Sequence, residues 1–269
     1  MQEQDSLEQK IDNLNSIAWN NRVNDSEKAM QFSQEAFPLS RQVNYKKGLA
    51  DALVIESFGY IRTSAFDKAT ISLDEAESIY KSSENIRGLA VLNEYKGIIE
   101  RYHGNSAASL EYIYKALEQS RQTSFTDNEV TNLYQLGVTY RHLANYDKAL
   151  EYLYMSLSLA RKINFPLMEA YNLNVIGSIY FETADYKQAL EYYKQGLIMR
   201  KQSGDKWGEA GSLNNIGFTC FKLQDYTEAV DYCDRSLAIA KETGDKKGQA
   251  NSLLHLAEIY SKKMIFQHR

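Results

Sequence analysis

The chain has 269 residues, of which 43% are hydrophobic and 25% are charged, a balance typical of a folded protein with an ample core. Its formal net charge of -4 argues against nucleic acid as the main partner, because nucleic-acid-binding domains carry clustered basic charge. No stretch approaches the roughly 18 apolar residues of a membrane span, so we expect no membrane partner. The polar start "MQEQDSLEQK" is not a signal peptide. We therefore expect a cytoplasmic protein, with a signal already removed from the chain as an open alternative.

The sequence repeats with a period of 40 residues. The stretch "SLNNIGFTCFKLQDYTEAVDY" from Ser212 aligns without a gap to "NLNVIGSIYFETADYKQALEY" from Asn172, and the same step continues in both directions. With only 2 prolines and 14 glycines, the chain has few strand or turn signals. We therefore predict an all-α single domain of two antiparallel helices per repeat. The predicted repeats cover residues 4–44, 45–84, 85–124, 125–164, 165–204 and 205–244, with a half repeat at 245–269.

Small and aromatic residues occupy fixed positions of this repeat. One small column holds Ser57, Gly97, Gly137, Gly177, Gly217 and Ala257, and an aromatic column holds Phe66, Tyr146, Tyr186, Tyr226 and Phe266. Small residues let two helices approach closely, and aromatic rings fill the space beside them. The columns therefore indicate where the paired helices pack.

The predicted helix ends carry the expected residue types. Asp205 and Asp245 precede helical stretches as N-caps, and Pro166 falls at a first helical turn. Gly204 and Gly244 follow the preceding helices, as C-terminal glycines do.

The order of these columns resembles the tetratricopeptide repeat (TPR) family over essentially the whole chain. The matching positions in one repeat are Gly177, Tyr180, Tyr186, Ala189, Tyr193 and Gly196. The resemblance implies a right-handed α-solenoid, with six full repeats plus one further helix. The departures are the 40-residue repeat, the absent closing proline, and leucine at the family's tryptophan position. The longer repeat is similar to that of kinesin light chains and of the TPR regions of bacterial signalling proteins.

Two repeats fit the pattern less well. In the first, Ile17 occupies the small column, and Pro38 should bend the second helix or end it early. In the third, Ser106 and Ser109 replace an aromatic residue and an alanine, and Glu100 replaces a core tyrosine.

The last helix keeps an apolar face that a capping helix would not show. We predict that this helix runs from about Asp245 to Lys262, and that Phe266 opens a second helix. The chain is therefore expected to be a fragment of a longer protein.

No catalytic signature is evident, so we expect neither an enzyme nor a cofactor. The four histidines, His103, His142, His255 and His268, lack metal-site spacing, and no metal is expected. The "GDKWGEAG" stretch joins two helices, so we interpret it as the turn between two repeats rather than as a phosphate-binding loop. Cys220 and Cys233 fall on core columns, which favours buried structural thiols.

The first helices of an α-solenoid usually line its concave binding face. Counting from the small column predicts which residues face that groove and contact a peptide or protein partner. They are Asn174, Asn214, Tyr134, Arg62, Arg101, Arg141, His142, Ser178, Phe181, Phe218, Phe221 and Lys222. Asn215, next to Asn214, is instead expected to contact the neighbouring repeat.

Two features of the predicted groove each have two interpretations. The basic residues near the ends of the first helices either complement the helix dipoles or bind carboxylates of an acidic partner. The groove-facing apolar residues Phe58, Ile98, Val138, Phe181, Phe218 and Phe221 either pack internally or bind a partner segment.

We therefore expect a non-catalytic scaffold that binds a protein or peptide segment in its groove. The resemblance implies the sensory or docking region of a bacterial signalling protein as one such use. The alternative is a structural spacer or a self-association arm without a groove ligand.

Overall fold

The computed structural model describes residues 2–22 and 25–267. Within these ranges the chain forms thirteen α-helices and no strand, which confirms the predicted all-α fold of six helix pairs and one further helix. The helices group into two compact units, Met1–Leu143 (unit 1) and Ala144–Arg269 (unit 2), which we describe separately.

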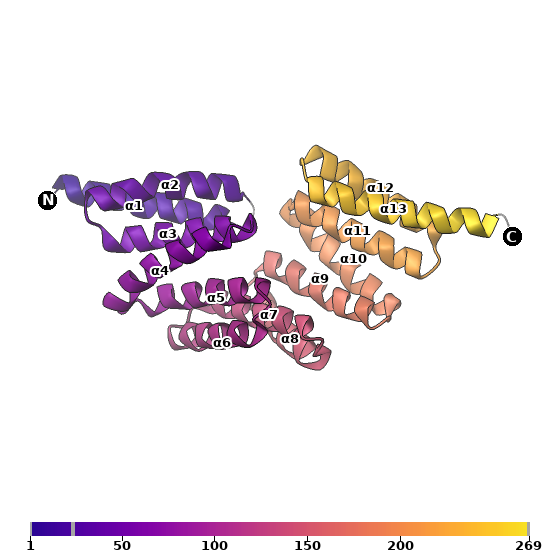
Figure 1. Ribbon diagram of the computed structural model, residues 1–269, viewed down its shortest axis with the longest axis horizontal. Coiled ribbons are helices and arrows are strands. Elements are labelled where there is room, and N and C mark those ends of the chain that lie inside the picture. The colour runs from indigo at the N-terminus through magenta and orange to yellow at the C-terminus, as the bar shows by residue number, and fades with distance from the viewer. Residues whose placement is uncertain (1, 23–24, 268–269) are drawn as a thin grey trace. The chain divides into compact units, whose positions relative to one another are not determined.

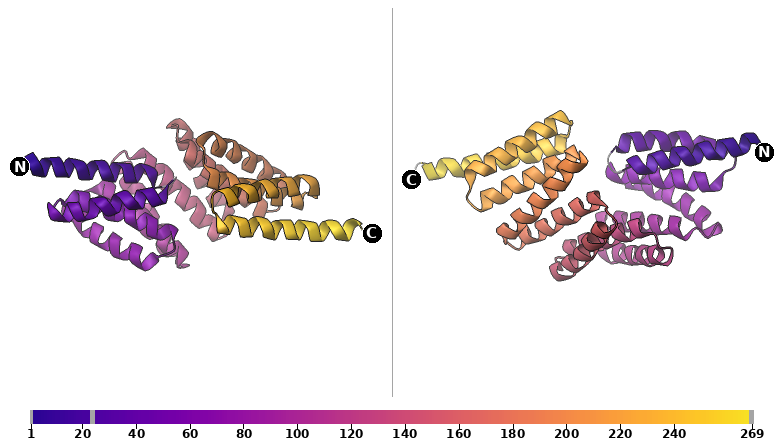
Figure 2. Two further views of the ribbon diagram at one scale, coloured as in Figure 1. Left: turned by 90° about the horizontal axis from the view of Figure 1, so that it is seen from above. Right: turned by 180° about the vertical axis from the view of Figure 1, so that it is seen from behind.

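Unit 1 contains seven helices that follow one another in a continuous stack (Figures 1 and 2). They are α1 (Gln2–Asn21), α2 (Ser26–Gln42), α3 (Lys46–Arg62), α4 (Phe66–Ser82), α5 (Ile86–Tyr102), α6 (Ser106–Gln122) and α7 (Thr126–His142). Each helix packs against the next. The first helices of successive repeats also touch, α1 with α3, α3 with α5, and α5 with α7. The first helices therefore form one layer of unit 1.

Unit 2 contains six helices with the same alternation (Figure 1). They are α8 (Tyr146–Lys162), α9 (Pro166–Glu182), α10 (Tyr186–Ser203), α11 (Lys206–Lys222), α12 (Tyr226–Glu242) and α13 (Lys246–Gln267). Consecutive helices again pack together, and α11 also touches α13.

The turns after α2 through α12 share one conformation. Each places a residue with positive φ at a spacing of twenty positions: Asn44, Ser64, Glu84, Gly104, Ser124, Ala144, Asn164, Ala184, Gly204, Gln224 and Gly244. Three are glycine, which adopts this left-handed conformation without a steric cost. The next residue but one then begins the following helix, so the turn sets a near-constant helix length.

The predicted helix caps are confirmed. The Asp205 and Asp245 side chains accept hydrogen bonds from Gly208 N (2.9 Å) and Gly248 N (2.9 Å). Pro166 is the first residue of α9, where its missing N–H leaves no helical bond unmade.

The small column lies where paired helices approach most closely. A Cβ atom added at Gly97 would come within 2.6 Å of Ile113, and one added at Gly217 would come within 2.6 Å of Cys233 Sγ. Buried leucines flank this column, with Leu133, Leu173 and Leu213 at most 2% exposed. The cores are therefore continuous between the helices of each pair.

The first repeat is out of register with the others by one residue. Ile17, on the predicted small column, is 40% exposed, whereas Ala18 is fully buried. Ile11, Leu14 and Ala18 take the places that Ala50, Leu53 and Ser57 hold in α3. The ungapped alignment was wrong here, because Ala18 and Ala29 lie 11 positions apart, whereas Ser57 and Ala69 in the second repeat lie 12 apart.

Two predicted helix ends were also wrong. Pro38 lies inside α2, which continues to Gln42. Proline removes only its own N–H bond, and the Pro38 ring is on the exposed side of the helix. Helix α13 continues to Gln267 past the expected end at Lys262, so no turn precedes position 266, although the Phe266 side chain lies outside the described residues.

The unusual residues of the third repeat make local polar contacts. Glu100 accepts a hydrogen bond from Asn105 Nδ2 at 2.8 Å, across the turn between α5 and α6. Ser109 is fully buried, and its Oγ lies 3.4 Å from Thr139 Oγ1 on α7. The serine therefore keeps the small volume of the alanine column and adds a polar contact between repeats.

Candidate functional site

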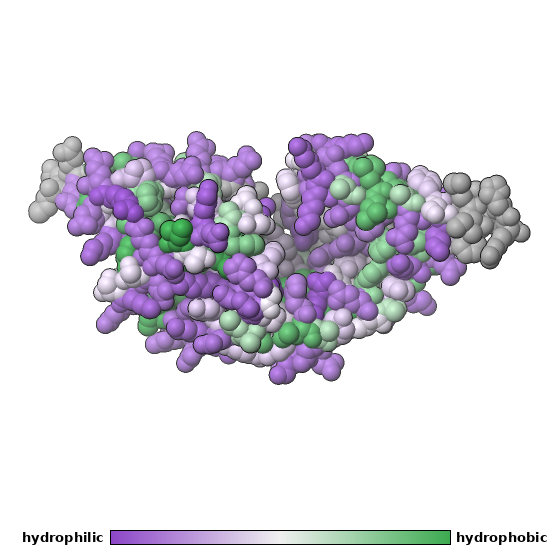
Figure 3. Space-filling model, viewed as in Figure 1, coloured by the Kyte–Doolittle hydropathy of each residue, from purple (hydrophilic) through white to green (hydrophobic). Residues whose placement is uncertain are grey.

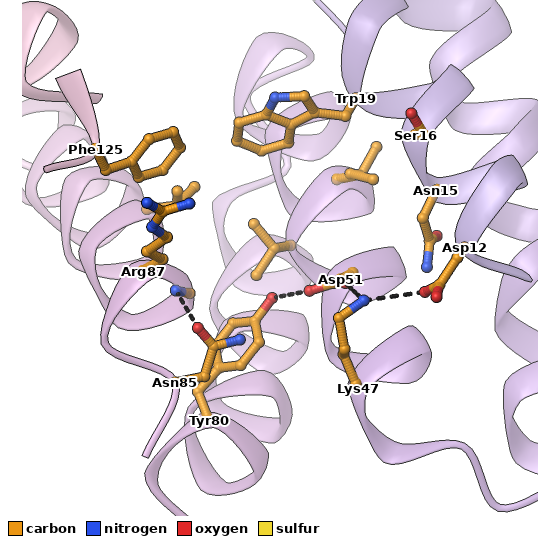
Figure 4. Close-up of a pocket in the computed structure, with 14 residues that line it drawn as sticks. Asp12, Asn15, Ser16, Trp19, Lys47, Asp51, Tyr80, Asn85, Arg87 and Phe125 are labelled. Atoms are coloured by element: carbon orange, nitrogen blue, oxygen red, sulfur yellow. Dashed lines mark hydrogen bonds and ion pairs between the residues drawn. The ribbon is translucent and has the colours of Figure 1, made fainter. Parts of the chain in front are cut away.

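A pocket of about 560 Å³ opens on the first-helix layer of unit 1 (Figure 4). Helices α1, α3 and α5 supply most of its walls, and Tyr80, Asn85 and Phe125 complete it from α4 and two turns. The lining residues are Asp12, Asn15, Ser16, Trp19, Lys47, Asp51, Val54, Ile55, Tyr80, Asn85, Arg87, Gly88, Val91 and Phe125. We call this the unit-1 pocket.

Aromatic side chains form much of the pocket wall. Trp19 is half-buried and carries the Arg22 guanidinium 3.6 Å above its ring. Tyr80 is 2% exposed, and a Cβ atom added at Gly88 would lie only 2.6 Å from its ring. Glycine at position 88 therefore lets α5 pack closely against the Tyr80 ring, and this contact holds the ring in the pocket wall.

A network of charged groups occupies the α1–α3 side of the pocket. Lys47 Nζ lies 3.0 Å from Asp12 Oδ1 and 3.3 Å from Asp51 Oδ2, and the Tyr80 hydroxyl donates to Asp51 Oδ1 at 2.7 Å. Burial lowers the pKa of Lys47, but the hydrogen bond to Asp12 and the charges of both aspartates outweigh it and raise that pKa. Lys47 is thus held as a cation between two carboxylates.

Arg87 lies on the opposite side of the pocket from Asp12 and Asn15 (Figure 4). Its Nη2 donates to the Thr123 carbonyl at 3.0 Å, and its guanidinium lies 5.6 Å from the Phe125 ring centroid. Among the described residues, no carboxylate forms an ion pair with Arg87. Most of its five N–H donors are therefore available to a ligand.

Asn15 presents an unmatched acceptor. Its Nδ2 donates to the Gly48 carbonyl at 2.8 Å, which fixes the orientation of the amide. Its Oδ1 is buried and accepts no hydrogen bond from the described residues, although the side chain is only 5% exposed. Such an unsatisfied acceptor costs roughly 1–3 kcal/mol.

Seven of the predicted site residues lie in unit 2, on α9 and α11. The Phe218 ring lies 5.6 Å from that of Phe181, 5.7 Å from that of Phe221 and 4.0 Å from the stacked imidazole of His255. Lys222 Nζ lies 4.6 Å from the Phe218 centroid. Phe221 is buried, Phe181 and Phe218 are partly buried, and Lys222 Nζ also lies 3.8 Å from Glu258 Oε1, so these side chains mainly contact one another.

Asn215 contacts the adjacent repeat as predicted, but the buried Asn214 also contacts an adjacent repeat. Asn215 Nδ2 donates to Asn174 Oδ1 at 3.1 Å, while Asn214 Oδ1 lies 3.1 Å from His255 Nδ1. Ser178, also on α9, accepts a hydrogen bond from the Tyr193 hydroxyl at 3.1 Å.

Asn214 also lines a second pocket of about 230 Å³ in unit 2. The other lining residues are Trp207, Ala210, Gly211, Ser236, Asp245, Lys247, Gly248 and Asn251. Trp207 and Lys247 hold the same repeat position as Lys47 and Arg87 of the unit-1 pocket. The repeat therefore places a pocket over the N-terminal half of its first helices in both units.

The five remaining predicted residues belong to α3, α5 and α7 of unit 1. Arg62 and His142 are exposed, and Arg141 and Tyr134 are partly buried. Arg101 is also partly buried, donates to Thr139 Oγ1 at 3.2 Å, and has its pKa lowered by burial. Arg101, which was predicted to face the groove, therefore packs partly against α7.

None of the twelve predicted residues lines the unit-1 pocket. The prediction selected the C-terminal halves of the first helices, whereas the pocket uses their N-terminal halves and α1. The repeat position that holds Lys47, Arg87 and Lys247 is basic in these three repeats, and this was the available signal. The sequence analysis missed Asp12, Asn15 and Trp19, because the one-residue change of register in the first repeat assigned them to the wrong repeat positions.

The apolar residues of the predicted groove are largely packed internally. Ile98, Val138 and Phe221 are at most 9% exposed, and the other three are partly buried. Both cysteines are free and buried, and burial raises the pKa of Cys220 to about 11 and that of Cys233 to about 12. Neither thiol is therefore reactive at neutral pH.

His255 stacks on Phe218 and lies close to Asn214. Burial lowers its pKa, an effect that Lys222 reinforces and Glu258 opposes. His268 lies outside the described residues. Within the described ranges, no group of three or more His, Cys, Asp or Glu side chains is placed to hold a metal ion. None of the described helices combines the length and apolar character needed to cross a membrane.

Solved structures with similar folds include a Rap protein complexed with competence and sporulation factor. It matches with a TM-score of 0.72 and 16% identity over 98% of this chain and 73% of its own. NprR in complex with its cognate peptide NprX matches with a TM-score of 0.69 and 18% identity over 95% of this chain and 72% of its own. These likenesses show the fold.

A third match is a signal transduction ATPase with a tetratricopeptide repeat sensor from Pyrococcus horikoshii. Its TM-score is 0.65 with 20% identity, and the match covers 88% of this chain but only 36% of that protein. No curated protein sequence matches the chain. The model of the tetratricopeptide repeat matches residues 88–162, 130–202 and 208–263. The chain belongs to the tetratricopeptide repeat family.

Proposed function

We propose that the chain is a non-catalytic scaffold that binds a peptide or a segment of a partner protein, with the unit-1 pocket as its main site. The observation that carries the proposal is the lining of this pocket. Its aromatic walls stand beside a guanidinium that has no carboxylate partner and an amide oxygen that accepts no hydrogen bond, among the residues that the structure describes. Preformed pockets of a few hundred Å³ with apolar walls and a few fixed polar groups are typical of ligand sites.

The similar structures support a peptide or protein as the partner. NprR is described in complex with its cognate peptide, and the Rap protein in complex with a competence and sporulation factor. The sensor role named for the Pyrococcus horikoshii protein supports a docking or sensory role within a signalling protein. The unit 2 residues Asn174, Asn214, Phe218 and Lys222 are the proposed second contact.

The test uses random dodecapeptides displayed on phage and panned on the full chain. Recovered peptides, resynthesised with a fluorescent label, are measured by anisotropy against two variants. Ser16→Trp fills the pocket from an exposed position, and Ser78→Trp adds the same bulk on an exposed part of α4. Binding should fall at least about tenfold with Ser16→Trp only. Recovery of no peptide, or equal binding by both variants, contradicts the proposal.

A second candidate function is self-association through α13. Leu253, Leu254 and Tyr260 are 53%, 66% and 47% exposed, whereas Leu213, at the position of Leu253, is 1% exposed. The face that Figure 3 shows is mostly hydrophilic, with its hydrophobic residues in separate small patches. Sedimentation of the wild type and of Leu253→Ser should show a concentration-dependent dimer only for the wild type. Monomers at all concentrations count against this function.

A further inference from the structure

The unit-1 pocket has a different electrostatic character on its two sides. Asp12 and Asp51 share the single cation Lys47 on the α1–α3 side, where Asn15 adds an acceptor. The opposite side carries Arg87, which has no acidic partner among the described residues. Figure 4 shows these two groups facing each other across Tyr80 and Trp19.

The acceptor side is suited to an N–H donor. Asn15 Nδ2 is committed to the Gly48 carbonyl, so the amide cannot turn to satisfy its Oδ1 from within the chain. A ligand N–H placed there removes the cost of the unsatisfied acceptor. Asp12 and Asp51 favour the same polarity, because they exceed the charge of Lys47.

The Arg87 side is suited to a carboxylate. Its bond to the Thr123 carbonyl and its position near Phe125 restrain the guanidinium without neutralising it. A restrained arginine binds a carboxylate through two parallel hydrogen bonds, and it loses little side-chain entropy on doing so. The Asn85 amide lies beside it in the pocket wall, with its Oδ1 committed to Gly88 N at 3.0 Å.

The space between the two sides is apolar. Trp19 lies between them and Phe125 lies beside Arg87 (Figure 4), and Val54 and Val91 are also lining residues of the pocket. A large apolar side chain fits this space, because burying aromatic and aliphatic surface supplies the main affinity of such pockets.

These three observations together define one class of ligand. We propose that the unit-1 pocket binds a peptide segment in which a carboxylate adjoins an aromatic or large aliphatic side chain. The carboxylate binds Arg87, the apolar side chain lies against Trp19 and Phe125, and a peptide N–H donates to Asn15 Oδ1. This assignment rests on the proposed function and specifies its ligand.

The experiment begins with the dodecapeptides recovered by panning on the full chain. Each peptide is resynthesised with its acidic residue replaced by the matching amide, and both forms are measured against wild type and Arg87→Gln. The acidic form should lose about tenfold in affinity on Arg87→Gln, and the amide form should bind both proteins equally. Arg41→Gln is the matched control, because Arg41 is exposed in unit 1 and lies outside the pocket.

Charge reversal provides the second measurement. Arg87→Glu should reject the acidic peptide and bind the same peptide with lysine in place of the acidic residue. Thermal unfolding of each variant checks the fold, which the exposed Arg87 should not affect. Peptides that bind the pocket without an acidic residue, or that bind Arg87→Gln as tightly as wild type, overturn the ligand assignment while leaving the proposed function intact. Recovery of no peptide contradicts the proposed function itself.

Discussion

Glu94 in unit 1 and Asn214 in unit 2 occupy the same position of the repeat, but the two units use it differently. Glu94 is 6% exposed and accepts hydrogen bonds from Asn128 Nδ2 (2.6 Å) and Thr131 Oγ1 (3.0 Å) on α7. Asn214 is 8% exposed and contacts His255 on α13. At this position unit 1 therefore buries the ionisable carboxyl group of Glu94 between neighbouring first helices. Unit 2 instead buries the neutral amide of Asn214 beside the imidazole of His255.

The difference shows that the repeat determines the backbone position and leaves the electrostatics to individual side chains. Burial raises the pKa of Glu94 to about 7, although its hydrogen-bond donors and Arg22 oppose the shift. Burial lowers the pKa of His255. The two units should consequently respond to pH in opposite directions, and the predictions below test that contrast and its structural basis.

The largest expected effect is the pH dependence of unit 1. The pKa of Glu94 is about 7 in the folded state and about 4.5 in the unfolded state. Between these two pH values the folded state binds more protons than the unfolded state, so the free energy of unfolding falls as the pH rises through this range. Glu94 should remove roughly 3 kcal/mol from the free energy of unfolding of the wild type by pH 8. Glu94→Gln should abolish this loss, as measured by denaturant unfolding at pH 5 and pH 8.

His255→Gln is the matched control in unit 2. A lowered pKa means that the unfolded state binds the proton first, so wild-type stability falls as pH decreases below about 6.5. The variant should lose that decrease. Amide hydrogen exchange should locate the Glu94 effect in α5 and α7. An unchanged pH profile for Glu94→Gln would show that the carboxyl titrates normally.

The second prediction concerns helix packing within one helix of unit 2. Gly217→Ala should cost about 1–3 kcal/mol, because its Cβ would lie 2.6 Å from Cys233 Sγ and 3.0 Å from the Ala229 carbonyl. Gly211→Ala, on the same helix with nothing within 4 Å, should stabilise by about 0.5–1 kcal/mol. Thermal unfolding of both variants checks the pair, and a stabilising Gly217→Ala would rule out close packing at the small column.

The third prediction returns to the basic residues of unit 1. Arg101→Ala should cost about 1–2 kcal/mol, because it removes a hydrogen bond to Thr139 and the packing of a partly buried stem. Arg62→Ala, at an exposed position, should change stability by about 0.5 kcal/mol or less. Equal effects in urea titrations would mean that Arg101 is not held in the interior.

The smallest expected effect should be the same in both units, because their turns share one conformation. Glu84 in unit 1 and Ala184 in unit 2 have φ of 51° and 63°. Replacing either by glycine should stabilise by about 0.5–1 kcal/mol, since strain is released and only part of the gain is lost to chain entropy. Calorimetry checks both variants. A gain in one unit only would indicate that the turns differ in strain.

Much of the fold could be predicted from the sequence, because a strict repeat averages out local ambiguity. The N-caps Asp205 and Asp245, the first-turn Pro166 and the packing role of Gly177 and Gly217 all depend on local chemistry that recurs. The prediction was wrong at Ile17 and Pro38, in the atypical first repeat, where the repeat supplied the least information.

The candidate site was far less predictable. Counting along a helix indicates which side chains share a face, but not how far an arginine such as Arg101 folds back into the interior. It also does not show which end of the first helices leaves a pocket. Asn15 and Arg87 became candidates only when the structure showed which of their polar atoms have partners.

The sequence by itself determined the number of helices, their pairing and the small residues at their contacts. These properties depend on helix propensity, turn chemistry and a periodic pattern, all of which are local. Only the tertiary structure decided that Trp19, Tyr80, Arg87 and Phe125 line one pocket, and that Glu94 is buried with a raised pKa. The physical reason is that burial, packing and the completion of hydrogen bonds depend on residues several repeats apart in the chain.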